Sequence, residues 1–254
     1  MIKRLKRNSS YIIVGAIGGI IFLILDEGFG IDKAILNNIF IFLVIIGSMF
    51  TIFRSIKRSK YVVSLLNDQY NVNLFLEEIE KDINKTLNDK NKKMLLINKS
   101  CGLNYKGDFE QSVEILKSID IKGINKVFKK SYYNNFLYNL LMLDRIDEAK
   151  EMFANHIDDI EVETKYKMLD ISTNHTLAAY EFYIGNLKKS REMFERLLEK
   201  DHSEINEVST FYFLGLMDLK EKKLEEGRQK LKKSAEFGNY YFISKMAKDL
   251  LSKY

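Results

Sequence analysis

The 254-residue sequence contains no proline, no tryptophan and a single cysteine. Proline removes a backbone donor and clashes with the preceding helical turn, so its absence favours long uninterrupted helices. With only Cys101, the chain cannot form an internal disulfide framework or a zinc site built from several cysteines. Its 46% hydrophobic and 30% charged residues can form a packed core, which excludes a disordered or low-complexity protein. We therefore predict an all-α protein.

Positive charge is concentrated near the N-terminus. Residues 1–60 contain nine Lys or Arg against three acidic residues, whereas residues 61–254 contain 31 basic and 32 acidic residues. The net charge of +5 therefore arises beside two apolar runs and not over the rest of the chain. This distribution indicates a membrane partner, and we expect no nucleic-acid binding.

Two uncharged runs are long enough to cross a bilayer. They cover residues 8–25 and 34–53, which as helices measure roughly 27 and 30 Å against a hydrocarbon core of about 30 Å. A cleaved signal peptide is the alternative for the first run, and a buried core helix is the alternative for the second. However, Asp26-Glu27-Gly28 is not a small-residue cleavage site, and 20 uncharged residues exceed the usual core helix. We predict a transmembrane hairpin over residues 1–60, with spans at about 9–25 and 34–53.

The flanking charges predict how this hairpin is oriented. Basic residues lie before the first run and after the second, whereas the connector carries three acids and Lys33. The positive-inside rule then places both termini, and all of the chain after the hairpin, in the cytoplasm at the cell membrane. The basic residues would also attract anionic lipid headgroups. They are Lys3, Arg4, Lys6, Arg7, Arg54, Lys57, Arg58 and Lys60.

Within the first run, Gly15 and Gly19 form a GxxxG pattern. Small residues at this spacing let another helix approach closely in lipid. The second span of the same hairpin is the most economical partner, and homodimerisation is the alternative.

Four later segments share one pattern: a helix, a short polar or glycine-containing turn, and a second helix that opens with an apolar residue. These opening residues are 37, 41 and 37 positions apart, and they are Phe109, Ile146, Leu187 and Leu224. Three positions after each comes a small residue: Ser112, Ala149, Ser190 and Gly227. Four positions further comes a large one: Leu116, Phe153, Phe194 and Leu231. The small residue permits close helix packing, and such hairpins must stack to bury their apolar faces.

These segments resemble tetratricopeptide (TPR) repeats over about residues 94–240. Phe211-x-x-Leu214-Gly215 is similar to the W-x-x-L-G opening of that family's first helix, and Gly107-Asp108-Phe109 resembles its turn, with Ser100 at the small position. The sequence departs from the family in lacking a terminal proline, in repeats longer than 34 residues and in the bulky Leu137. The resemblance implies an α-solenoid of TPR-like helix pairs over residues 94–254. Capping helices are expected within 61–93, over 72–87, and at the C-terminus over 240–251.

No catalytic pattern is present. His156, His175 and His202 lie in different expected elements without metal-ligand spacing, and the sequence contains no P-loop, GxSxG or kinase signature. Cys101 is expected to be an inert, half-buried thiol. We therefore expect a protein that is not an enzyme, with no metal, cofactor or small-molecule substrate.

The resemblance implies a concave groove lined by side chains of each first helix that point away from the second. Tyrosine offers a large contact area and asparagine can bond an extended backbone, so both suit peptide binding. The expected groove residues, beside Cys101, are Asn104, Tyr105, Asn134, Tyr138, Leu141, Tyr212 and Leu216.

The resulting hypothesis is a membrane-anchored scaffold or adaptor that binds a protein or peptide partner at the inner membrane surface, where confinement raises the local concentration. The alternative is an accessory subunit of a larger transport or secretion complex that assembles through its transmembrane hairpin. Abundant Lys, Asn and Ile are typical of low-GC bacterial proteins.

Overall fold

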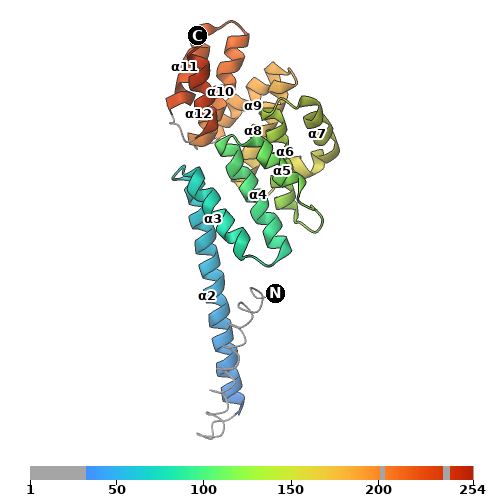
Figure 1. Cartoon of the computed structure of the whole chain (residues 1–254), viewed down its shortest axis with the longest axis vertical. Coiled ribbons are helices and arrows are strands. Elements are labelled where there is room, and N and C mark those ends of the chain that lie inside the picture. The colour runs from blue at the N-terminus through green and yellow to red at the C-terminus, as the bar shows by residue number, and fades with distance from the viewer. Residues whose placement is uncertain (1–32, 201–203, 237–240, 254) are drawn as a thin grey trace. The chain divides into compact units, whose positions relative to one another are not determined.

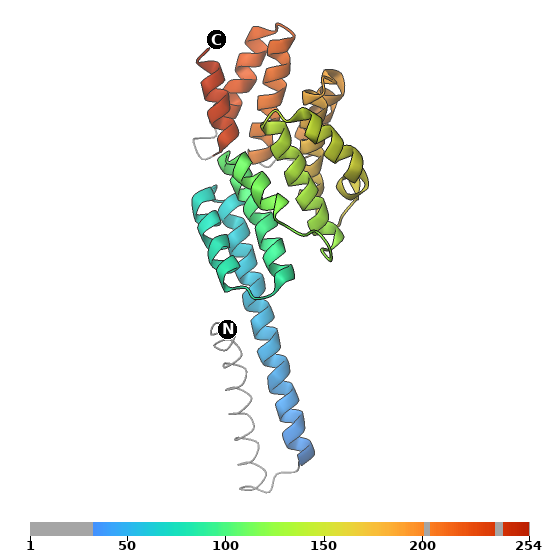
Figure 2. The ribbon, with the colours of Figure 1, turned by 45° about the vertical axis from the view of Figure 1, so that its right-hand side comes forward.

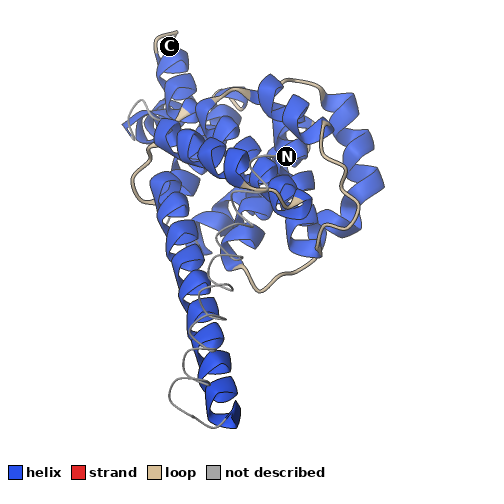
Figure 3. Cartoon of the chain, turned by 60° about the horizontal axis from the view of Figure 1, so that its bottom comes forward, coloured by secondary structure: helices blue, strands red, loops and turns tan. Residues whose placement is uncertain are grey.

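The computed structural model describes residues 33–200, 204–236 and 241–253, and all regular elements within these ranges are α-helices (Figure 3). The all-α prediction is confirmed for this part of the chain. Two compact units divide between Tyr61 and Val62. The helices, labelled in Figure 1, are α2 Lys33–Asn67, α3 Val72–Lys85, α4 Asp89–Lys106, α5 Phe109–Lys117, α6 Lys126–Met142, α7 Ile146–Glu161, α8 Lys167–Tyr183, α9 Leu187–Lys200, α10 Glu204–Lys220, α11 Leu224–Glu236 and α12 Phe242–Leu251.

The described part of the first unit is the long helix α2. Its segment Asn37–Leu66 is long and apolar enough to cross a membrane, with a mean hydropathy of 2.3 in its most apolar stretch, none of which is buried. Arg54, Lys57 and Lys60 are exposed, and Arg58 is half-buried. Within the described residues there is thus one candidate span, over the second predicted run. The first predicted span and its flank, with Lys3, Arg4, Lys6, Arg7, Gly15 and Gly19, lie outside the described residues.

The second unit begins with the last residues of α2 packed on α3. Val62, Leu65 and Leu66 form a small buried cluster with Phe75 and Ile79 of α3. This cluster extends to α4, on which α3 packs. The end of the apolar helix α2 is therefore built into the core of the second unit.

The helices that follow form four antiparallel pairs, α4–α5, α6–α7, α8–α9 and α10–α11 (Figures 1 and 2). The second helix of each pair begins at the apolar residue that the sequence pattern predicted, which confirms the helix boundaries at Phe109, Ile146, Leu187 and Leu224. The first helices also pack on one another in chain order, α4 on α6, α6 on α8 and α8 on α10. The four first helices α4, α6, α8 and α10 therefore lie next to one another as one row.

The small residue of each second helix lies at the point where the two helices of a pair come closest. The Ser112 hydroxyl donates to the carbonyl oxygen of Ser100 at 3.1 Å, and the Ser190 hydroxyl donates to that of Ala178 at 2.8 Å. A Cβ added to Gly227 would lie 3.1 Å from the carbonyl oxygen of Gly215. Close backbone approach is thus required in these pairs, as the sequence pattern indicated.

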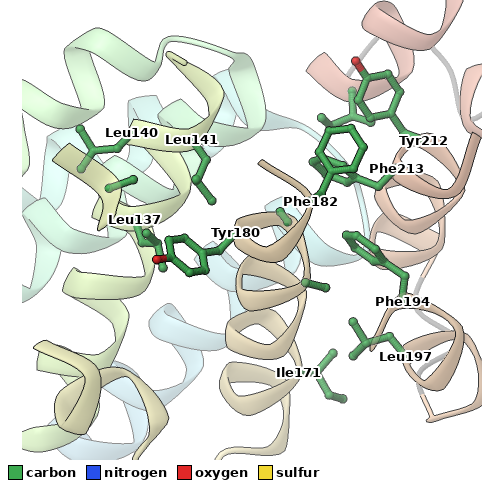
Figure 4. Close-up of a cluster of buried hydrophobic side chains, with 14 of the residues drawn as sticks. Leu137, Leu140, Leu141, Ile171, Tyr180, Phe182, Phe194, Leu197, Tyr212 and Phe213 are labelled. Atoms are coloured by element: carbon green, nitrogen blue, oxygen red, sulfur yellow. The ribbon is translucent and has the colours of Figure 1, made fainter. Parts of the chain in front are cut away.

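The core between the pairs is rich in aromatic and leucine side chains (Figure 4). The rings of Phe194 and Phe213 stack with centroids 5.1 Å apart, and Phe182 meets Phe213 edge-on at 5.4 Å. Leu141 and Tyr212 belong to this same cluster (Figure 4).

Charged groups that are buried in the second unit are paired. Asp218 is 2% exposed and lies 2.9 Å from Arg191, with Lys230 as its second partner. The Lys130 ammonium donates to Asp170 at 2.5 Å and to the carbonyl oxygen of Val162 at 2.7 Å. These pairs join α10 to its neighbours α9 and α11, and α6 to α8.

The C-terminal helix α12 brings the two ends of the series of pairs together. It packs on α10 and α11 and also on α4, the first helix of the first pair. The ring of Phe242 meets Phe109 edge-on at 5.1 Å, and Tyr241 lies against Tyr105 at 5.4 Å. Gly107, at the end of α4 with φ +88°, leaves room for the Phe242 ring.

Candidate functional site

Four first helices line a small, partly open cavity of about 60 Å³ within the second unit. Each helix contributes three side chains at a spacing that places them on one helical face. The residue Tyr241, which precedes α12, lines the cavity as well. The helical lining consists of Cys101, Asn104 and Tyr105 of α4; Asn134, Asn135 and Tyr138 of α6; Ser172, His175 and Thr176 of α8; and Ile205, Asn206 and Ser209 of α10.

The position of the lining residues changes steadily along the series. Asn104 lies five residues before the first residue of α5, and Tyr138 lies eight before that of α7. His175 lies twelve before that of α9, and Ser209 lies fifteen before that of α11. Each step of three or four residues is about one helical turn. Successive first helices are therefore shifted by a turn, and the row of lining residues crosses them diagonally.

Two asparagine oxygens of the lining are buried without a hydrogen-bond partner among the described residues. They are Oδ1 of Asn104 and Oδ1 of Asn134, on residues that are 8% and 3% exposed. The buried hydroxyl of Ser209 is hydrogen-bonded with the hydroxyls of Tyr138 and Tyr241. Asn135, by contrast, donates to the carbonyl oxygen of Ile97 at 3.3 Å and to Oγ of Ser100 at 3.0 Å. An unpaired buried polar group costs about 1–3 kcal/mol. The unpaired oxygens from two different helices thus lie in one cavity, where a ligand could satisfy them.

Among the residues that the structure describes, the lining contains no Asp, Glu, Lys or Arg. Burial raises the pKa of the Cys101 thiol to about 12 and that of the Tyr241 hydroxyl to about 12. Burial also raises the pKa of Tyr105 and that of Tyr138 well above the ordinary value of a phenol. At neutral pH these groups are therefore uncharged hydrogen-bond donors, and Cys101 lacks the thiolate that nucleophilic chemistry requires.

The cavity brings together part of the groove expected from the sequence. Asn104, Tyr105, Asn134 and Tyr138 line it, together with Cys101. The other three expected residues do not line it: Leu141 and Tyr212 are buried in the hydrophobic core, and Leu216 packs against that core.

The expected groove residues that lie outside the cavity follow the same helical faces, but further toward the helix ends. Leu141 lies one turn beyond Tyr138, and Tyr212 lies one turn beyond Ser209. The sequence analysis placed the groove residues at the same distance before the second helix in every pair. In the structure, the lining positions move by about one turn from each pair to the next. The sequence interpretation also missed Asn135, Ile205, Asn206, Ser209, Tyr241 and the entire contribution of α8. A turn-by-turn shift of the register would have found Ser172, His175 and Thr176.

Among the described residues, no group of three or more His, Cys, Asp or Glu side chains could hold a metal ion. Comparison with protein families, curated proteins and solved structures finds no match for this chain. The functional argument therefore rests on the cavity and on the apolar helix α2.

Proposed function

We propose that this protein is a membrane-anchored adaptor whose helix pairs form a TPR-like α-solenoid that binds a segment of a protein partner at the cytoplasmic face of the membrane. The observation that carries the proposal is the convergence of two unpartnered, buried asparagine oxygens from α4 and α6 in one cavity. Proteins tolerate such groups where a ligand satisfies them. The absence of charge and of a thiolate at this cavity favours binding over catalysis.

The membrane anchor of the proposal is the two-span hairpin predicted from the sequence, with both termini in the cytoplasm. Support comes from α2, whose consecutive side chains from Ile39 to Ile46 are all exposed although all are apolar. Such a surface needs lipid or other apolar helices around it. Anchoring would raise the encounter rate between the adaptor and other proteins at the same membrane by increasing their local concentration.

Site-specific photocrosslinking of the full-length chain in cells tests the adaptor function. The photoreactive amino acid p-benzoylphenylalanine would replace Asn206, which lines the cavity, or the exposed Glu195 of α9 as a matched control. We expect the Asn206 variant to yield a discrete adduct whose crosslinked peptide maps to one short segment of one partner. Equal products from both positions, or no adduct from position 206, would contradict the proposal.

The exposed apolar surface of α2 also fits an accessory subunit that assembles with other membrane proteins through the hairpin. In that case a Gly15→Leu/Gly19→Leu variant would still insert but would no longer co-purify with its partners. The adaptor function requires that the same variant still co-purifies with its partner, because the partner is held by the second unit.

A further inference from the structure

We propose that the cavity selects an uncharged primary carboxamide, presented by an Asn or Gln side chain of the bound segment. The source of the group rests on the proposed function, whereas its chemistry follows from the cavity itself. Charge, hydrogen-bonding capacity and size each point to this group.

Charge excludes ionic ligands. Burying a carboxylate or ammonium is costly unless an opposite charge pairs with it. Elsewhere in the second unit the buried charges of Asp218 and Lys130 have such partners. The described part of the cavity lining offers none, because it contains no acidic side chain, lysine or arginine. The group that enters must therefore be neutral.

Hydrogen-bonding capacity requires donors as well as an acceptor. The unpartnered oxygens of Asn104 and Asn134 accept and cannot donate, so the ligand must supply N–H or O–H groups to both. The Tyr138 hydroxyl donates to that of Tyr241, and the neutral phenol of Tyr241 can donate to the ligand in return. A primary carboxamide has two N–H donors and one carbonyl oxygen with two acceptor positions. An alcohol has one donor and would leave one asparagine oxygen unpaired.

Size agrees with a small group. The cavity of about 60 Å³ compares with the ~10–15 Å³ that one water molecule needs. It therefore holds on the order of four to six atoms of water size. A carboxamide and its attached methylene fall at this size. The rings of Tyr105 and Tyr241, 5.4 Å apart, supply apolar surface for the methylene.

Protection of Cys101 measures occupancy of the cavity directly, because this residue lines it and is the chain's only cysteine. Full-length protein in detergent at pH 8 would be incubated for hours with the small uncharged reagent methyl methanethiosulfonate in the presence of propionamide, propionate, propylammonium or propanol. The long incubation is needed because burial raises the pKa of Cys101 to about 12, so that only a small fraction of the thiol is ionised and reactive at this pH. Saturation-transfer NMR of the same four probes gives a second readout that does not depend on the thiol.

We expect saturable binding of propionamide, with at least fivefold slower Cys101 modification, and no effect of the two ions at the same concentration. Equal or tighter binding of propionate or propylammonium would overturn the inference. It would also fall if neither readout detected propionamide.

Two variants and a matched control locate the binding. Asn134→Asp keeps the side-chain shape but adds a negative charge, so preference should switch from propionamide to propylammonium. Ser209→Ala should weaken propionamide binding about threefold or more. Ser234→Ala should leave it unchanged, because Ser234 is also a buried serine but does not line the cavity. Helical circular dichroism confirms that each variant folds. If Ser209→Ala and Ser234→Ala changed propionamide binding equally, propionamide would not bind in this cavity.

Peptides distinguish the source of the carboxamide. The probes are acetyl-Ala-Ala-X-Ala-Ala-N-methylamide peptides with Gln, Glu or Leu at X, since the N-methyl cap removes the terminal primary amide. Protection of Cys101 by the Gln peptide alone supports a side chain as the source, and protection by propionamide but by no peptide identifies a free amide instead.

If position 206 crosslinks a partner while propionamide does not bind, the adaptor function stands and the carboxamide inference fails. If propionamide binds but no partner is crosslinked, the carboxamide inference stands and the adaptor function fails.

Discussion

Asparagine serves two opposite purposes in this molecule. Asn71, Asn88 and Asn125 precede α3, α4 and α6, and their side chains accept from the backbone N–H three residues on, at 2.9–3.1 Å. These contacts satisfy donors that a helix start leaves unpaired. Asn104 and Asn134 instead keep a buried oxygen without a partner inside helices. The first group stabilises the fold, whereas the second carries a cost that ligand binding can relieve.

Replacing Asn104 by an apolar residue should therefore stabilise the fold and weaken ligand binding. Asn104→Leu removes an unpaired buried oxygen and adds a better helix former, so we expect the free energy of unfolding to rise by about 1 kcal/mol without ligand. Propionamide binding should be lost. Thermal unfolding followed by circular dichroism measures the first effect.

Asn135→Leu is the matched control, because the Asn135 amide donates to Ile97 and Ser100. This change should lower stability by about 1–3 kcal/mol, since it leaves buried acceptors unpaired. Destabilisation by Asn104→Leu to the same extent would show that Asn104 is a structural residue.

At the scale of the helix, the starts of α5, α7, α9 and α11 were predictable from the sequence because local rules determine them. Phe109 is buried and Ile146 and Leu187 pack against the core directly after the turn, whereas Leu224 is 53% exposed. A small residue follows each of the four about one turn later, where the helices pack closely. The cavity was only half predictable, because it depends on how far each pair is shifted relative to the preceding pair. That shift follows from packing between side chains distant in the sequence. The sequence analysis assumed the same register for every pair, and it therefore placed the buried core residue Leu141 in the groove beside Tyr138.

The contact of α12 with the first pair yields a prediction for two glycines. Gly107 and Gly185 both follow a first helix with φ near +90°, but only Gly107 has a ring packed over it, that of Phe242. Ala at position 185 should cost about 1 kcal/mol from backbone strain alone. Ala at position 107 should cost about 3 kcal/mol, because a Cβ there also collides with Phe242. Urea unfolding of the two variants measures the difference.

Limited proteolysis provides the complementary readout, since Gly107→Ala should also expose α12 to cleavage. Equal losses of stability for Gly107→Ala and Gly185→Ala would show that the contact between α12 and α4 contributes little.

For the whole chain, the sequence predicted the all-α composition and the apolar helix α2 because long patterns without proline or charge determine both. It did not predict that α12 packs on α4 as well as on α10 and α11, because no periodicity records a contact between the two ends of the series. Tyr241 joined the cavity through this contact and was therefore missed.

The proposed orientation is testable with single cysteines in a Cys101→Ala background. Phe29→Cys lies in the predicted connector, and Lys232→Cys lies on the exposed surface of α11. A maleimide that cannot cross membranes should label position 29 in intact cells and position 232 only after permeabilisation, because the basic flanks favour the cytoplasm. Labelling of position 232 in intact cells would show that the chain has the opposite orientation in the membrane.

The diagonal course of the cavity limits how this architecture can grow. Its lining begins near the end of α4, at Asn104, and reaches the start of α10 at Ile205, so three shifts of about a turn have used the available helix. A tandem duplication of one more pair would move the next lining positions beyond the start of the added helix. Lengthening the binding surface would therefore require longer helices in addition to more repeats, and helix length and repeat number must change together.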